Sequence, residues 1–160
     1  MVQEIGPFIF KITCTEERRV IANEVFLDAS YAIALSSTND QFHAKAVTLA
    51  FELEKNNTRI ITTRAVILEI GNALAKLRFR NDAIRLLHSL ENDLTITIIP
   101  LSEDIFQRAF ALFQQRKDKE WGITDCISFI VMKDKRLKDA ISADEHFRQA
   151  GFRALLLDIQ

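Results

Sequence analysis

The chain has 160 residues, of which 48% are hydrophobic and 27% charged, with only four Gly and two Pro. This composition fits one globular domain and excludes a disordered, collagen-like or low-complexity chain. The 21 Lys and Arg residues nearly balance the 22 Asp and Glu residues, and the net charge of −1 excludes a global positive field for nucleic acid. Any contact with nucleic acid must therefore come from a local patch.

Two cysteines, Cys14 and Cys126, are too few for a disulfide scaffold, and there is no C-x-x-C pair of the kind that binds zinc. The first residues carry Glu4 and have no long apolar stretch of the kind that a signal peptide needs. No apolar run reaches the roughly 18 residues of a membrane span. We therefore expect a cytoplasmic protein in a reducing compartment, with no membrane contact.

Residues 1–22 differ from the rest of the chain, because the short apolar segment PFIFKIT is followed by the charged run TEERR. We interpret 1–22 as an amino-terminal extension or an extra edge strand, and 23–160 as the folded domain. The boundary rests on the start of a regular alternation of strand-like and helix-like patterns near residue 25.

From residue 25 onward, short β-branched runs alternate with segments of helical periodicity. The expected strands are 25–28, 59–62, 94–100, 139–143 and 153–158. The expected helices are 39–57, 63–79, 81–92, 102–117, 123–136 and 144–151, with Ser102 as an N-cap. Strands separated by helices require crossover connections, so the pattern predicts an α/β fold with a mostly parallel sheet.

Four acidic residues lie at the ends of expected strands or near the starts of expected helices, and we call them the acid quartet: Asp28, Glu69, Asp125 and Asp144. Asp28 has apolar flanks, and such a carboxylate is costly to bury unless it is paired, hydrogen-bonded or bound to a metal. Parallel sheets bind ligands outside the carboxyl ends of their strands. We therefore expect the quartet to converge at that edge of the sheet.

Two members of the quartet have plain structural alternatives within their own segments. Asp28 is a candidate N-cap for the helical turn 29–35. Glu69 is a candidate acid in the first turns of helix 63–79, where it would face the positive end of the helix dipole.

The other two members have similar alternatives. Thr124 is a candidate cap that would leave Asp125 as an acid in the first turn of its helix. The S-x-x-E pattern at 142–145 fits a capping box, with Asp144 in the first turn. Capping and coordination are compatible roles for one residue.

Convergent carboxylates need a compensating charge, because they repel one another and raise each other's pKa. Mg²⁺ and Mn²⁺ supply such a charge and accept a few carboxylates together with water. A cation held in this way suits hydrolysis of a phosphodiester, since it activates water and neutralises phosphate charge. The quartet therefore indicates a metal-dependent phosphodiesterase.

Four segments, VFLDASYAIAL, TTRAVILEIGNAL, KEWGITDCISFIVMK and ISADEHFRQAGF, resemble the PIN-domain ribonucleases in order and context. The chain looks most like the VapC-type toxins of VapBC toxin–antitoxin modules and their stand-alone relatives, over about residues 24–158. By this resemblance the acid quartet matches the family's metal-binding and catalytic acids, and Thr124 matches the Ser/Thr that supports the site. The resemblance also implies a three-layer α/β/α fold around a central sheet.

The resemblance implies an endoribonuclease that depends on Mg²⁺ or Mn²⁺ and cleaves single-stranded or loop RNA. Attack of water on phosphorus with departure of the 3′-oxygen would leave a 3′-hydroxyl and a 5′-phosphate. The resemblance further implies a cognate antitoxin protein and a homodimer. The dimer has a physical motive as well, because Phe106, Phe110 and Phe113 form one apolar stripe on the expected helix 102–117. Residues 1–22 depart from the family pattern, which begins at its first strand.

Three further residues have both a functional and a plain interpretation. Asp118 is a fifth acid near the site, although a loop charge is the plainer interpretation. His43 falls near the expected site mouth, although a surface or semi-buried helix histidine is the plainer interpretation. Cys126 follows Asp125 and fits a small core residue better than a nucleophile. The basic residues around 116–119 and 133–138 fit a solvated face or contacts with phosphates.

Several other functions are weighed against the toxin. A stand-alone PIN nuclease without an antitoxin, and a non-catalytic RNA-binding or protein-binding module on the same fold, both remain open. An aspartyl-phosphate phosphatase needs Asp-x-Asp after the first strand, whereas this chain has Asp28-Ala29-Ser30. A phosphoacceptor receiver domain needs a lysine after the last strand, and LLLDIQ offers none.

Overall fold

The computed structural model describes residues 22–158. Its strands are β1 (Glu24–Leu27), β2 (Arg59–Thr63), β3 (Ile96–Ile99), β4 (Asp139–Ile141) and β5 (Arg153–Ala154). Its helices are α1 (Ala29–Ser36), α2 (His43–Lys55), α3 (Arg64–Ala73), η1 (Leu77–Phe79, a 3₁₀ turn), α4 (Arg80–Asn92), α5 (Glu103–Gln115), α6 (Ile123–Asp134), α7 (Glu145–Gln149) and α8 (Leu155–Asp158). The interpretation of 1–22 as an extension or extra strand lies, except for Ala22, outside the described residues.

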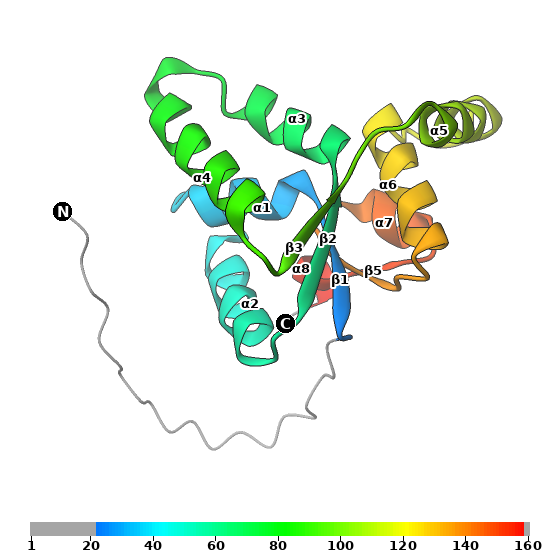
Figure 1. The fold of residues 1–160 in the computed structure, drawn as a ribbon. Helices are drawn as coiled ribbons and strands as arrows, with labels where there is room; N and C mark the ends of the chain where they lie inside the picture. The colour runs from blue at the N-terminus through cyan, green and yellow to red at the C-terminus, as the bar shows by residue number, and fades with distance from the viewer. Residues whose placement is uncertain (1–21, 159–160) are drawn as a thin grey trace.

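The five strands form one parallel sheet in the order β3-β2-β1-β4-β5. Phe26 of β1 is in register with Ile61 of β2 on one side and with Ala140 of β4 on the other. Figure 1 shows α1 and α2 on one side of the sheet and α6 and α7 on the other. The expected three-layer α/β/α architecture is therefore confirmed.

The strand order reverses between β1 and β4, and this reversal places the site. From β1 the chain moves outward through β2 to β3, and it then crosses back to place β4 on the opposite side of β1. Right-handed crossovers put the helices of the two halves on opposite faces of the sheet. The carboxyl ends of β1 and β4 thus form a topological switch point, which is where open parallel sheets bind their ligands.

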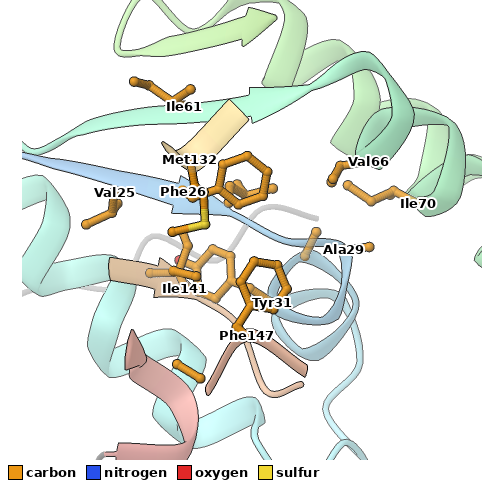
Figure 2. Close-up of a cluster of buried hydrophobic side chains, with 14 of the residues drawn as sticks. Val25, Phe26, Ala29, Tyr31, Ile61, Val66, Ile70, Met132, Ile141 and Phe147 are labelled. Carbon is orange, nitrogen blue, oxygen red and sulfur yellow. The ribbon is translucent and has the colours of Figure 1, made fainter. Parts of the chain in front are cut away.

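The core fills the space between the sheet and the helices with apolar side chains from both (Figure 2). Phe26 and Ile141 from adjacent strands are fully buried. The Phe147 ring of α7 lies 6.0 Å from the Phe26 ring and 5.2 Å from the Phe129 ring of α6, measured between ring centroids. These contacts anchor α6 and α7, whose first residues reach the switch point.

The prediction of a last strand over 153–158 is correct for its first two residues and wrong from residue 155 onward. Only Arg153 and Ala154 pair with β4, and residues 155–158 form the helical turn α8. The Leu156 N–H donates to the Ser142 carbonyl at 3.2 Å, and Leu156 is fully buried. A short apolar run such as LLL fits a strand or a buried helix equally, and here tertiary packing decided.

The expected single helix 63–79 is also wrong in its second half. Helix α3 ends at Ala73, and the chain turns through residues 74–76 into η1 and α4. The segment ALAKL has good intrinsic helix propensity, but propensity is a weak signal beside packing. Leu74 is buried at the turn, whereas Leu77 is 89% exposed.

Other expectations hold within a few residues. The Ser102 hydroxyl accepts a hydrogen bond from the Ile105 N–H at 3.2 Å and caps α5, as predicted. Within residues 22–158, no helix combines the length and apolar character needed to cross a bilayer.

Candidate active site

Asp28 follows β1 directly and is buried, with 6% of its surface exposed. Its Oδ2 accepts hydrogen bonds from the Ser30 N–H at 3.2 Å and from the Ser142 hydroxyl at 2.8 Å. Burial raises the pKa of Asp28, the charge of Asp144 adds to this rise, and the serine hydrogen bonds oppose it. Asp28 is the N-cap of α1, as its structural alternative predicted, and it also lies at the switch point.

Two serines join the loops after β1 and β4. The Ser30 hydroxyl accepts from the Ala143 N–H at 2.9 Å, and the Ser142 hydroxyl accepts from the Asp144 N–H at 2.9 Å. The two hydroxyl oxygens lie 3.2 Å apart. These contacts fix the loop that carries Asp144 relative to Asp28. Sequence analysis gave the serines no supporting role, although each stands two residues from a quartet member.

Asp125 lies in the first turn of α6, and its side chain is 16% exposed. Its Oδ2 accepts from the Gly122 N–H at 2.8 Å. Burial is the largest cause that raises the pKa of Asp125, and the Asp144 charge also raises it. The expected cap at Thr124 is wrong, because Gly122 is the N-cap and Thr124 already lies inside the helix.

Asp144 is itself the N-cap of α7, where its Oδ1 accepts from the His146 N–H at 2.9 Å. The expected capping box at 142–145 is therefore wrong. It requires Ser142 as the N-cap and Glu145 as the third helical residue, whereas Asp144 is the N-cap and Glu145 is the first helical residue. The other Asp144 oxygen, Oδ2, lies 3.3 Å from His146 Nδ1. One carboxylate oxygen thus caps the helix while the other faces the site.

His146 is the residue that the sequence analysis missed. Its Nδ1 lies 3.1 Å from Asp125 Oδ2 as well as 3.3 Å from Asp144 Oδ2. The ligand-forming atoms of these three side chains all lie within 4.8 Å of one another. The signal in the sequence was the spacing D-x-H at 144–146, which places the imidazole two residues after the aspartate that caps α7.

Glu69 lies in the second turn of α3, within the first turns of the helix as its structural alternative predicted. The side chain is exposed at the rim of the quartet. Partial burial raises the pKa of Glu69, and the charges of Asp28 and Asp125 raise it further. A hydrogen bond from the Thr124 side chain opposes this rise, which places Thr124 beside Glu69.

The structure therefore brings all four members of the quartet within electrostatic reach of one another. Asp125 and Asp144 form, together with His146, the tightest group at the site, whereas Asp28 is bonded to the two serines and Glu69 lies at the rim. Burial and like charge raise the pKa values of Asp28, Glu69 and Asp125, so a bound cation would supply a countercharge that favours their ionised forms. Such a donor set, mainly carboxylate oxygen, fits a hard divalent cation.

The three further candidates have structural roles. His43 Nδ1 lies 2.9 Å from the Ala34 carbonyl oxygen and joins α2 to α1. Asp118 accepts two hydrogen bonds from the Arg116 guanidinium, at 2.8 and 3.0 Å, and this partner lowers the pKa of Asp118 to about 2. Cys126 is fully buried, and burial raises the pKa of its thiol to about 11, as expected of an inert core residue.

The fold and the acids at its switch point define the class of protein. The family model of the PIN domain matches residues 25–153, and the chain belongs to the PIN-domain family. PIN domains are nucleases, so this membership supports the expected enzyme class, a phosphodiester hydrolase.

Two curated relatives and one solved structure are similar to this chain. The 23S rRNA-specific endonuclease VapC20, from two strains of Mycobacterium tuberculosis (CDC 1551 and H37Rv), is 23% identical over 128 residues, which is 80% of this chain and 95% of the relative. The crystal structure of M. tuberculosis VapC20, described as a sarcin-ricin loop cleaving toxin, superposes with a TM-score of 0.74 at 22% identity. It covers 81% of this chain and 97% of that one. This likeness supports a VapC-type PIN fold.

Proposed function

We propose that this chain is a metal-dependent endoribonuclease and the toxin of a toxin–antitoxin module. The observation that carries the proposal is the convergence of Asp28, Asp125 and Asp144 at the switch point, with Glu69 at the rim. The pKa values of Asp28, Glu69 and Asp125 are raised by burial and by like charge. A divalent cation bound among these carboxylates would offset the repulsion.

In this proposal the acid quartet holds one or two Mg²⁺ or Mn²⁺ ions. The bound cation supplies Lewis acidity, which activates a water molecule and neutralises charge on the scissile phosphate. Asp125 and Asp144 offer carboxylate oxygens as ligands, and Asp28 is fixed by Ser30 and Ser142. The attacking water forms a bond to phosphorus while the bond from phosphorus to O3′ breaks, which leaves a 5′-phosphate and a 3′-hydroxyl.

Thr124 supports the site through Glu69. Its side chain hydrogen-bonds the Glu69 carboxylate and favours the ionised form against partial burial. The Glu69 carboxylate is exposed, so it lies at the rim of the site, where a phosphodiester would enter. Thr124 is thus proposed as a positioning residue.

The substrate class follows from chemistry and from the relatives. Single-stranded or looped RNA is favoured over a paired helix, because unstacked bases can be splayed out so that a protein reads their edges, whereas a paired helix is read mainly by its shape and backbone. The relatives are named for cleavage of 23S rRNA and of the sarcin-ricin loop. An rRNA hairpin loop is therefore the first substrate to test for this chain.

Two partners belong to the proposal. The phenylalanine stripe of α5 is exposed, with Phe106, Phe110 and Phe113 at 37%, 41% and 45%. The Phe106 and Phe110 rings stack at 6.1 Å between centroids, which makes one continuous apolar surface. Such surfaces mark interfaces, and we assign this one to a homodimer. A cognate antitoxin would place a cationic side chain opposite the acid quartet.

The test is incubation of the purified full chain with hairpin RNAs in Mg²⁺, in Mn²⁺ and in EDTA, followed by mapping of the cleaved ends. We expect cleavage within loops, dependent on the cation, and lost in Asp125→Asn. A Ser128→Ala chain is the control, because Ser128 lies in the same helix and donates only to the Thr124 carbonyl. Cation-dependent binding without cleavage would favour the non-catalytic module instead. Cleavage without growth arrest on expression would favour a stand-alone nuclease.

A further inference from the structure

We infer that His146 Nδ1 is a direct ligand of the cation, so that the site binds through oxygen and nitrogen and prefers Mn²⁺ to Mg²⁺. The inference rests on the proposed function of the acid quartet as a metal centre, and it adds a residue that the quartet does not contain. Its basis is the geometry of His146 relative to Asp125 and Asp144.

The distances match those between neighbouring ligands of one ion. Octahedral ions of this class hold their ligands at about 2.1 Å, which places adjacent ligand atoms about 3 Å apart. His146 Nδ1 lies 3.1 Å from Asp125 Oδ2 and 3.3 Å from Asp144 Oδ2. The three ligand atoms all lie within 4.8 Å of one another, so one ion placed among them is within reach of the nitrogen and of both carboxylates.

The imidazole is held where a ligand must be. The His146 N–H is bonded to Asp144 Oδ1 at 2.9 Å, so the ligand pair Asp144 and His146 moves as one unit. The next residue, Phe147, is fully buried against Phe26 and Phe129 and fixes the turn of α7. The His146 side chain is 26% exposed, which leaves it open to an ion from solvent.

A comparison within the chain separates His146 from a purely structural histidine. His43 Nδ1 faces a single backbone carbonyl oxygen, that of Ala34, at 2.9 Å. His146 Nδ1 faces two carboxylates from different elements, α6 and the start of α7. One hydrogen on Nδ1 satisfies one carboxylate well, whereas an ion in the same place satisfies the nitrogen and both carboxylates together.

Ligand chemistry then sets the metal preference. Mg²⁺ favours an all-oxygen shell and keeps several waters, whereas imidazole suits the transition metals. A shell with one imidazole nitrogen therefore favours Mn²⁺. Replacement of His146 by Gln removes the nitrogen but keeps a polar side chain, so it should weaken Mn²⁺ binding about ten-fold or more and Mg²⁺ binding much less.

Pulsed electron paramagnetic resonance on the full chain loaded with Mn²⁺ tests the assignment without any activity measurement. We expect modulation from a directly bound ¹⁴N nucleus, replaced by the ¹⁵N pattern when the histidines are ¹⁵N-labelled. The chain has three histidines, so a double variant His43→Gln with His88→Gln should retain the signal, and His146→Gln should lose it. The double variant assigns the nitrogen even if His146→Gln does not fold.

The outcomes separate the inference from the proposed function. If Mn²⁺ binds and RNA is cleaved but no nitrogen coupling appears in the wild-type chain, the His146 assignment is wrong and the nuclease stands. If the nitrogen signal disappears in the double variant, another histidine binds the ion and the assignment is again wrong. If neither Mn²⁺ nor Mg²⁺ binds the wild-type chain and no RNA is cleaved, both the inference and the proposed function fail.

Discussion

Replacement of Ser142 by Ala should destabilise the metal-free protein by about 2–3 kcal/mol, because one buried hydroxyl serves two partners. Ser142 is fully buried, donates to Asp28 Oδ2 at 2.8 Å and accepts from the Asp144 N–H at 2.9 Å. A hydrogen bond to a charged group is worth roughly 1.5–3 kcal/mol, and an orphaned buried donor costs roughly 1–3 kcal/mol. Asp28 keeps its hydrogen bond from Ser30, so the expected loss of stability is smaller than the sum of these two contributions.

For a domain of this length, such a loss lowers the Tm by about 4–12 °C. The cost should also depend on pH. The Ser142 hydrogen bond lowers the pKa of Asp28, so it stabilises the ionised carboxylate more than the protonated one. The destabilisation should therefore be larger at a pH above the raised pKa of Asp28, where the carboxylate is ionised, than at about pH 4, below that pKa.

Urea denaturation of the metal-free chain at both pH values measures this difference. Ser128→Ala is the matched control, since Ser128 is also buried, but its hydroxyl donates only to the Thr124 carbonyl at 2.9 Å. Its loss should cost less than about 1 kcal/mol and should not vary with pH. Equal losses in the two variants, or a Ser142→Ala loss that does not change with pH, would refute the network that ties Asp28 to Asp144.

Three more predictions follow from the site and the surface. Asp125→Asn should abolish cleavage and keep or raise the Tm of the metal-free chain, because burial raises the pKa of Asp125 and its ionised form opposes folding. That advantage should be absent at low pH and should grow as the pH rises through the raised pKa; an advantage that shrinks would contradict the sign. About 1 mM Mn²⁺ should raise the Tm of the wild-type chain but not of Asp125→Asn, and equal shifts would place the cation elsewhere. Phe110→Lys should convert the proposed dimer to a monomer in light scattering, whereas Phe51→Lys should not, although Phe51 of α2 is more exposed (63% against 41% for Phe110). A monomeric wild-type chain would contradict the dimer.

The sequence was sufficient for the sheet and for the placement of the acids, because both depend on local patterns. Asp28 ends a short apolar run, and chain direction alone puts the end of such a strand at the ligand edge. The parallel direction of the strands follows from the helices between them, because a helical crossover connects parallel strands whereas a short hairpin connects antiparallel ones. The phenylalanine stripe could also be predicted from the sequence, because the spacing of the three residues places them on one face of a helix.

The parts that could not be predicted depend on contacts between distant segments. The end of α3 and the turn of residues 155–158 are set by packing, which outweighs the propensity of ALAKL and LLL. The cap at Gly122 depends on a backbone N–H that meets Asp125. His146 joined the site only because α6 and α7 bring 125 and 146 together, 21 residues apart in the chain.

Cleavage of a defined RNA hairpin in H₂¹⁸O, with mass spectrometry of both products, tests the central claim most directly. Attack by cation-activated water predicts one ¹⁸O atom in a new 5′-phosphate and a 3′-hydroxyl on the other fragment, with no product in EDTA or with Asp125→Asn. A 2′,3′-cyclic phosphate without ¹⁸O, formed equally in EDTA, would mean attack by the neighbouring 2′-hydroxyl and would contradict a metal centre built on the acid quartet.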